Sequence, residues 1–293
     1  FEFRTRTCSA ELKRYPFYPI GTLVILRKMA RFGMLGATGS VGLIAMKTLL
    51  QGRGGGAQPS TIVVVGRRQV PSWNDQVNIL QTVVTMPEND NVESLDAFRE
   101  KVTKALEGSD AALITFGAGA PSKVSSDALR LLDVTIPTEF AKAAKTAGVK
   151  HMALLTSVGA DSTAKPSRWT GTAAGGGLYV QCKGRVEDNV RAVGFESFSV
   201  FRPSTLVGSP NTPKIASVLT GFVDWALPDR FKRIHIDKLG RAMAFDAFEK
   251  LDSLENGPFD SVFEGKSLFE LVARSEAALK AKQESGEEPR SEL

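Results

Sequence analysis

Apolar and polar positions form two alternating patterns between residues 31 and 210. Short runs that are almost entirely apolar, and often β-branched, are typical of strands buried on both faces of a parallel sheet. Longer stretches place their apolar residues at helical spacing. The predicted strands are residues 32–36, 61–65, 83–84, 111–116, 152–156 and 198–201, and the predicted helices are residues 41–49, 92–106, 138–147 and 178–193. This alternation predicts an α/β fold in which helices cover both faces of a doubly wound parallel sheet.

Beyond residue 210 the alternation loosens, although residues 238–250 still predict a helix. We therefore expect four segments. They are an N-terminal extension at residues 1–28 that is disordered or carries a targeting signal, the α/β domain at residues 29–210, a small C-terminal lobe at residues 211–278 packed on that domain, and a flexible tail at residues 279–293.

The composition is that of an ordinary globular protein, with 42% hydrophobic and 24% charged residues. Residues 1–28 contain six basic and two acidic residues, so they account for +4 of the formal net charge of +5. The remaining chain is nearly neutral, which gives no electrostatic case for binding nucleic acid. No run of about 20 apolar residues is present, so the sequence predicts no membrane span.

Cysteine and histidine are both scarce. Cys8 and Cys182 are too few for a disulfide framework, which is typical of a reducing compartment. His151 and His235 lie far apart in the sequence with no cysteine cluster near them, so we expect no metal site. We also expect Cys182 to serve packing, and His235 with Asp237 to cap a helix.

Residues 1–28 leave two interpretations of the cellular location open. They are rich in arginine, poor in acids, and contain a short apolar stretch at residues 20–26, a composition that fits a mitochondrial presequence. Translated non-coding sequence ahead of a start at Met29 fits as well. We expect a cytoplasmic protein, and a mitochondrial one if residues 1–28 are a genuine presequence.

A glycine-rich motif, Gly36-Ala-Thr-Gly-Ser-Val-Gly42, separates the first predicted strand from the first predicted helix. Gly36 permits a tight turn, Gly39 lets a backbone approach a pyrophosphate, and Gly42 lets the helix pack close to the strand. The start of the helix offers N–H groups and the positive end of its dipole to phosphate. The sequence therefore predicts a Rossmann-type dinucleotide site, with a turn that binds no ligand as the alternative. The candidate residues are Gly36, Thr38, Gly39, Ser40, Val41 and Gly42.

Two arginines follow the second predicted strand. In a dinucleotide fold this position meets the adenosine ribose, where an acidic residue favours NAD and an arginine suits the 2′-phosphate of NADP. Arg67 and Arg68 stand here, and no acidic residue occurs between Val65 and Asp75. The sequence therefore favours NADP over NAD, with a solvated basic pair as the alternative.

Candidate catalytic residues follow two later strands. Tyr179 and Lys183 have the i, i+4 spacing that places both side chains on one helix face, where a lysine cation favours a phenolate. Tyr179 is therefore a candidate general acid or base, and Ser157, at the end of a predicted strand, is a candidate donor to a substrate oxygen. Gly119 follows another strand, where a small residue lets a cofactor lie against the backbone. An incidental tyrosine–lysine pair and a hydroxyl that bonds a loop backbone are the alternatives.

Taken together, these motifs resemble the atypical or extended short-chain dehydrogenase/reductase superfamily, in particular its Tat-interacting-protein oxidoreductase-like branch and the fungal mitochondrial relatives. The residues that carry the resemblance are 35–42, 65–68, 150–161, 178–187 and 200–203. The resemblance implies a Rossmann fold, binding of NADP(H), and a Ser/Tyr/Lys triad made of Ser157, Tyr179 and Lys183. The chain departs from this pattern by a glycine-rich insertion at residues 162–177 and by a longer first crossover at residues 51–60.

Three functions remain open on the sequence. The first is an NADP(H)-dependent oxidoreductase that reduces a carbonyl or oxidises an alcohol of an unidentified small molecule. The second is a non-catalytic NADP(H)-binding regulator or assembly factor with a protein partner. The third is an epimerase that retains its cofactor tightly. We expect a monomer or a homodimer in each case.

Overall fold

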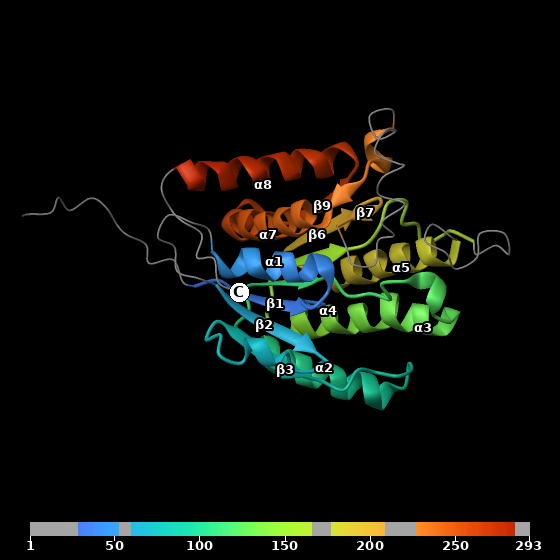
Figure 1. The fold of residues 1–293 in the computed structure, drawn as a ribbon. Coiled ribbons are helices and arrows are strands. Elements are labelled where there is room, and N and C mark those ends of the chain that lie inside the picture. The colour runs from blue at the N-terminus through green and yellow to red at the C-terminus, as the bar shows by residue number, and fades with distance from the viewer. Residues whose placement is uncertain (1–28, 53–59, 166–176, 209–226, 285–293) are drawn as a thin grey trace, which may run out of the picture.

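The computed structural model describes residues 29–52, 60–165, 177–208 and 227–284. Among these residues, seven strands form one sheet in the order β3-β2-β1-β4-β5-β6-β9, and every neighbouring pair is parallel (Figure 1). The strands are β1 (Arg31–Leu35), β2 (Thr61–Gly66), β3 (Ile79–Val83), β4 (Ala111–Ile114), β5 (His151–Leu155), β6 (Ser197–Arg202) and β9 (Phe259–Glu264). The chain reverses its direction of travel across the sheet between β1 and β4, which creates a crevice at the carboxyl ends of these two strands.

Helices cover both faces of the sheet (Figure 1). One face carries α1 (Ser40–Leu50), α7 (Ile236–Ser253) and α8 (Lys266–Glu284). The other face carries α2 (Val92–Leu106), α4 (Ile136–Thr146) and α5 (Gly177–Val193). Short elements complete the described part: α3 (Ser126–Arg130), a π-helical turn (Leu131–Thr135), 3-10 turns at Pro71–Trp73, Pro121–Lys123, Asp229–Phe231 and Leu254–Asn256, and a separate two-stranded sheet of β7 (Leu206–Val207) and β8 (Ile234–His235).

The central strands β2 and β4 are almost entirely apolar because both of their faces are covered. All four residues of β4 are buried, and so are the four central residues of β2. The helices begin and end where the local sequence allows it. For example, the Asn91 side chain accepts the Glu93 N–H at the start of α2, and Gly148 takes a φ of +87° just after α4.

The predicted α/β architecture is confirmed. The helix predicted at residues 92–106 has the observed bounds of α2, and the strands β2, β5 and β6 lie within a residue or two of their predicted positions. Strand β3 begins at Ile79, four residues before its predicted start at residue 83. Because β3 lies at the edge of the sheet and contains Gln81 and Thr82, it lacks the continuous apolar run of a central strand.

The segment after residue 227 extends the main sheet as well as forming β8. Helix α7 packs closely on α1, where a Cβ at Gly240 would lie 2.7 Å from Ile44 Cβ, and β9 pairs with β6. Two elements here were not predicted. Strand β9 alternates between more and less exposed residues because it is an edge strand, and α8 continues to Glu284, into the residues expected to form a flexible tail.

A buried polar cluster lies between α7 and the amino ends of β5 and β6. His151 Nδ1 lies 3.0 Å from the hydroxyl of Ser197, and its Nε2 lies 3.8 Å from Asp246 Oδ2. Burial, helped by the nearby Lys250 charge, lowers the pKa of His151 to about 3, so this imidazole is neutral. Burial raises the pKa of Asp246 from 3.8 to about 6.

Asp246 should therefore make the stability of the protein depend on pH. The folded state binds the carboxyl proton more tightly than the unfolded state, so this contribution is fully present below the unfolded pKa of 3.8 and is lost as the pH rises through about 6. From a pH below 3.8 to alkaline pH, the loss of this contribution should lower the free energy of unfolding by about 2–3 kcal/mol. Asp246→Asn should remove that fall in urea unfolding experiments, whereas Asp75→Asn, at an exposed site, should keep it. Equal pH dependence in the wild type and Asp246→Asn would contradict this.

Candidate functional site

The glycine-rich turn between β1 and α1 places the start of α1 at the crevice. Gly36 has a φ of +94°, and a Cβ there would lie 2.6 Å from the backbone nitrogen of Phe116. A Cβ at Gly42 would lie 2.2 Å from the carbonyl oxygen of Gly36, so the first turn of the helix packs directly on the glycine turn. Gly39 is the N-cap, no side chain caps the helix, and Thr38 and Gly39 are exposed. The amino end of α1 is therefore accessible to an anion.

The other two candidates in this turn have different surroundings. Ser40, the first residue of α1, is half-buried, and Val41 is buried in the core shared with α7. The Val41 side chain thus packs in the core, and only the backbone of this residue could contact a ligand.

A cavity of about 620 Å³ lies over the carboxyl ends of β2, β3 and β4, next to this turn. We call it the strand-end cavity. Its walls include Arg67, Val84, Lys101, Phe116, Gly117 and Ala118. Arg67 lines the cavity, and Arg68 is exposed beside it. Apolar walls next to a guanidinium group suit a flat heteroaromatic ring that carries a phosphate.

Tyr179 and Lys183 lie together on α5, as their spacing predicted. The Lys183 Nζ is 5.5 Å from the centroid of the Tyr179 ring. Lys183 is buried, however, and its ammonium donates to Asp133 Oδ1 at a distance of 2.9 Å. Burial by itself would lower the pKa of Lys183, but the charges of Asp133 and Tyr179 outweigh it and raise this pKa above its ordinary value. Lys183 therefore stays a cation.

Ser157 lies directly after β5, with its hydroxyl oxygen buried and without a hydrogen-bond partner among the described residues. The described part of the chain contains no hydrogen bond between Ser157 and Tyr179. The structure thus brings Tyr179 and Lys183 together, whereas Ser157, two residues after the end of β5, makes no hydrogen bond to either among the described residues. Most of the insertion predicted at residues 162–177 lies outside the described residues.

The loop after β4 approaches the same lysine. A Cβ at Gly117 would lie 2.4 Å from Asp133 Oδ1 and 3.4 Å from Lys183 Nζ, so a side chain there would displace the Asp133 carboxylate. Gly119, the residue singled out on the sequence, has a φ of +67° with open space around its Cβ position. Its role in the structure is to turn the loop, whereas Gly117 makes the close approach.

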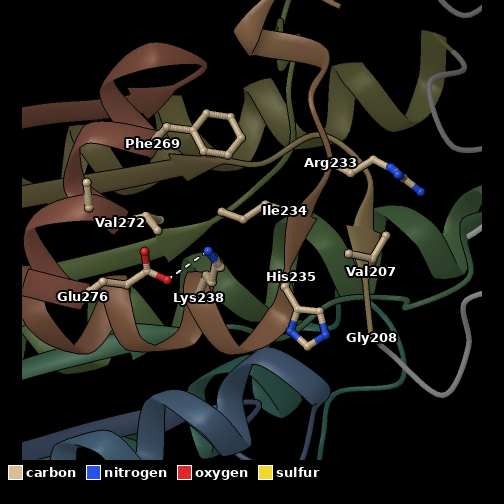
Figure 2. Close-up of a pocket in the computed structure, with 10 residues that line it drawn as sticks. Val207, Gly208, Arg233, Ile234, His235, Lys238, Phe269, Val272 and Glu276 are labelled. Carbon is tan, nitrogen blue, oxygen red and sulfur yellow. Dashed lines mark ion pairs between the residues drawn. The ribbon is translucent and has the colours of Figure 1, made fainter. Parts of the chain in front are cut away.

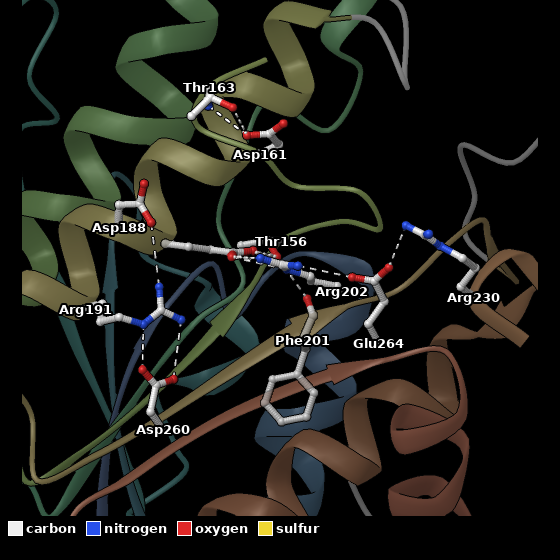
Figure 3. A network of polar contacts seen from close by, with 11 residues as sticks. Thr156, Asp161, Thr163, Asp188, Arg191, Phe201, Arg202, Arg230, Asp260 and Glu264 are labelled. Atoms are coloured by element: carbon white, nitrogen blue, oxygen red, sulfur yellow. Dashed lines mark hydrogen bonds and ion pairs between the residues drawn. The ribbon is translucent and has the colours of Figure 1, made fainter.

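A polar network ties the strand that precedes Ser157 to α5 (Figure 3). The Thr156 hydroxyl donates to Glu187 Oε1 at 2.6 Å, and the Arg202 Nε donates to the same oxygen at 3.0 Å. Arg202 also donates to Glu264 Oε2 at 3.2 Å. Hydrogen bonding to Glu187 raises the pKa of Arg202. The network joins β5, α5, β6 and β9 at their site-facing ends and so limits movement of α5 relative to Ser157.

A second cavity of about 620 Å³ lies between α7, α8 and the β7–β8 sheet, and it shares no lining residue with the strand-end cavity (Figure 2). Ile234, Phe269 and Val272 supply apolar walls, and Lys238 and Glu276 form an ion pair of 3.0 Å beside them.

His235 is the N-cap of α7 and accepts the Asp237 N–H, as predicted. Cys182 is buried against Leu129 and Leu178, which agrees with its expected packing role.

Two site residues were missed on the sequence, Asp133 and Glu187. Asp133 lies 50 positions before Lys183, and Glu187 lies 15 positions before Arg202. One signal for Asp133 was available, because it is a single acidic residue in the otherwise apolar stretch 131–134. Nothing local, however, indicated its partner.

The parallel sheet reverses its strand order beside a glycine turn, a helix start without a side-chain cap, and the strand-end cavity. This combination defines a dinucleotide-binding Rossmann protein. In agreement, a family model described as NAD(P)H-binding matches residues 36–224, and the chain belongs to this family.

Curated relatives extend the comparison. Protein HTATIP2 of Rattus norvegicus is 30% identical over 174 residues, which are 59% of this chain and 62% of the relative's length. Protein FMP52-1, mitochondrial, of Scheffersomyces stipitis is 29% identical over 250 residues, which are 82% of this chain and 98% of the relative. These matches confirm the resemblance stated from the sequence motifs.

Solved structures share the fold at low sequence identity. The enzyme WbmH of Bordetella bronchiseptica, in complex with NAD+, is 15% identical with a TM-score of 0.55, over 81% of this chain and 75% of that one. The oxidoreductase ylbE of Lactococcus lactis is 18% identical with a TM-score of 0.52, over 90% of this chain and all of that one.

The expected cytoplasmic location is contradicted by the relatives. The FMP52 proteins of Scheffersomyces stipitis, Meyerozyma guilliermondii and Candida albicans are all named as mitochondrial. A low cysteine content indicates a reducing compartment but does not distinguish the cytoplasm from compartments inside the mitochondrion, which is why that reasoning failed. In the described part of the chain, no helix has the length and apolarity needed to cross a bilayer.

Gly42, in the first turn of α1, and Gly39, its N-cap, should respond differently to the same substitution. Gly42→Ala should lower the free energy of unfolding by about 1–3 kcal/mol, since the new methyl group meets backbone atoms that cannot move aside. Gly39→Ala is the matched control, because the nearest atom to its Cβ, the Gly36 carbonyl oxygen, would lie 3.2 Å away, and it should change stability by less than about 1 kcal/mol. Urea unfolding of both variants measures this, and equal losses would show that the contact between α1 and the turn is not tight.

Proposed function

We propose that this protein is an NADP(H)-dependent oxidoreductase that reduces a carbonyl, or oxidises an alcohol, of a small molecule. The observation that carries the proposal is the Tyr179–Lys183 pair on α5, with its cation held beside the phenol. The family's NAD(P)H-binding description supports the cofactor class.

The residues present fit a dinucleotide. The pyrophosphate would lie at the uncapped start of α1, against the backbone of residues 36–42, where the glycines leave no side chain in the way. The adenosine would occupy the strand-end cavity. Arg67, on the cavity wall, and Arg68, exposed beside it, are placed to hold a 2′-phosphate, which is the reason for preferring NADP to NAD.

The chemistry divides among three side chains. A bound nicotinamide would supply the hydride for the carbonyl carbon. Tyr179 would donate its phenolic proton to the carbonyl oxygen, so that a C–H and an O–H bond form as the C=O π bond breaks. Lys183 would stabilise the phenolate that remains and would hold the nicotinamide ribose. Ser157, whose hydroxyl has no partner among the described residues, donates a hydrogen bond to the same substrate oxygen.

A second candidate function is a regulator or assembly factor that binds NADP(H) without turnover. It is favoured by two observations: Lys183 is already paired with Asp133, and Ser157 and Tyr179 share no hydrogen bond. The two candidates agree on the cofactor and differ only in catalysis.

The assignment of the arginines predicts a change in cofactor preference. Arg67→Ala combined with Arg68→Ala should weaken NADPH binding by about tenfold to a hundredfold, because charged hydrogen bonds to the 2′-phosphate are lost. NADH binding should change much less. Fluorescence titration measures both, with Arg274→Ala on α8 as a control for removal of an unrelated positive charge. Equal weakening of both cofactors would refute the 2′-phosphate assignment.

Tyr179→Phe distinguishes enzyme from regulator. On a panel of aldehydes and ketones, this variant should reduce NADPH oxidation by about a hundredfold or more, since the proton donor is gone. NADPH affinity should be unchanged, because the ring remains. If the wild type reduces nothing on the panel yet binds NADPH, the regulator is the better account.

A further inference from the structure

The Lys183 ammonium is held by a buried carboxylate that neither the family description nor the proposed triad includes. Lys183 Nζ and Asp133 Oδ1 are 2.9 Å apart, and their side chains are only 8% and 1% exposed. Buried ion pairs contribute little net stability, because desolvation of the two charges offsets their attraction. Stability alone therefore does not explain why this pair is present.

The local backbone is arranged to aim Asp133 at this lysine. Asp133 lies in the middle of the π-helical turn Leu131–Thr135, and such turns are uncommon and occur often at functional sites. The loop after β4 makes room for the carboxylate at Gly117, as described above, and the Ala118 N–H lies 3.4 Å from Asp133 Oδ1. The second carboxylate oxygen, Oδ2, is buried and has no hydrogen-bond partner in the described part of the chain. Two segments, the loop after β4 and helix α5, thus contact the same oxygen atom of Asp133.

This arrangement constrains what Lys183 can do. An ammonium group has three N–H donors, and Asp133 takes one, so the direction of the remaining two is fixed by the rigid carboxylate. The ionisable groups that act on Lys183 are Asp133 from the π-helical turn and Tyr179 and Cys182 from α5 itself. Of these, Asp133 is the one that hydrogen-bonds to the ammonium.

We propose that Asp133 is a positioning residue of the cofactor site, which holds the Lys183 ammonium, as a cation, beside Tyr179 and the Gly117–Ala118 backbone, where the ribose of a bound NADP(H) lies. This inference rests on the proposed function, because it uses Lys183 as a contact of the cofactor. Asp133 itself acts through Lys183 and touches neither cofactor nor substrate.

The pH dependence of NADPH binding tests the inference. Wild-type affinity should stay within about twofold between pH 7 and pH 9, because Lys183 remains protonated. Asp133→Asn leaves Lys183 buried without its counter-charge, so burial should remove its proton at the alkaline end, and NADPH should bind about tenfold more weakly at pH 9 than at pH 7. Lys183→Met should bind weakly at both pH values, with no pH dependence.

A rescue separates this role from a merely structural one. In Asp133→Asn combined with Lys183→Arg, the guanidinium stays protonated without a neighbouring carboxylate, so the pH dependence should disappear. Circular dichroism and urea unfolding monitor the fold of every variant. If Asp133→Asn fails to fold, the double variant Asp133→Leu with Lys183→Met replaces it, because this apolar pair carries no buried charge. Its NADPH affinity should equal that of Lys183→Met.

The outcomes distinguish the two proposals. A wild type that does not bind NADPH overturns the proposed function and this inference with it. A wild type that binds NADPH, together with an Asp133→Asn variant whose affinity is independent of pH, overturns the role of Asp133 alone. So does a further loss of affinity in the apolar pair beyond that of Lys183→Met, because Asp133 would then act other than through Lys183.

Discussion

The contact between the first turn of α1 and the glycine turn after β1 is the constraint on which the site depends. Gly42 lies so close to the Gly36 carbonyl that even one methyl group would overlap it. This closeness places the amino end of α1 at the point where the sheet reverses its strand order. A larger residue at either position would move the helix away, and the phosphate-binding end of its dipole would no longer face the crevice.

Buried polar groups lie at both ends of the sheet, and they differ in kind. At the amino ends of β5 and β6, His151 and Asp246 are enclosed by α7, and burial favours the neutral form of each. At the carboxyl ends, Lys183 is hydrogen-bonded to Asp133, and Arg202 to Glu187, so each cation has a carboxylate partner. Ion pairs therefore lie at the end of the sheet where a charged cofactor would bind, whereas the opposite end buries a neutral imidazole and a carboxyl group whose pKa is raised to about 6.

The paired state of Lys183 bears on whether the protein is an enzyme. A lysine that is bonded to a carboxylate exerts a weaker net field on Tyr179 than an isolated cation, because the two charges offset one another at the phenol. The same pairing holds the lysine in one place, which favours binding of the cofactor. The ion pair is therefore compatible with both candidate functions, which share cofactor binding and differ in catalysis.

Local sequence determined the elements and the local parts of the site. Apolar runs identified the central strands, the glycine spacing identified the turn before α1, and the i, i+4 spacing placed Tyr179 beside Lys183, because each of these signals depends only on neighbouring residues. Tertiary structure alone decided the rest. Strand β9 joins the sheet through pairing with β6, Asp133 meets Lys183 across 50 residues, and Glu187 gathers Thr156 and Arg202 from two strands. Such contacts depend on how the helices pack on the sheet, and an edge strand or a single buried acid carries no periodic pattern that would reveal its partner.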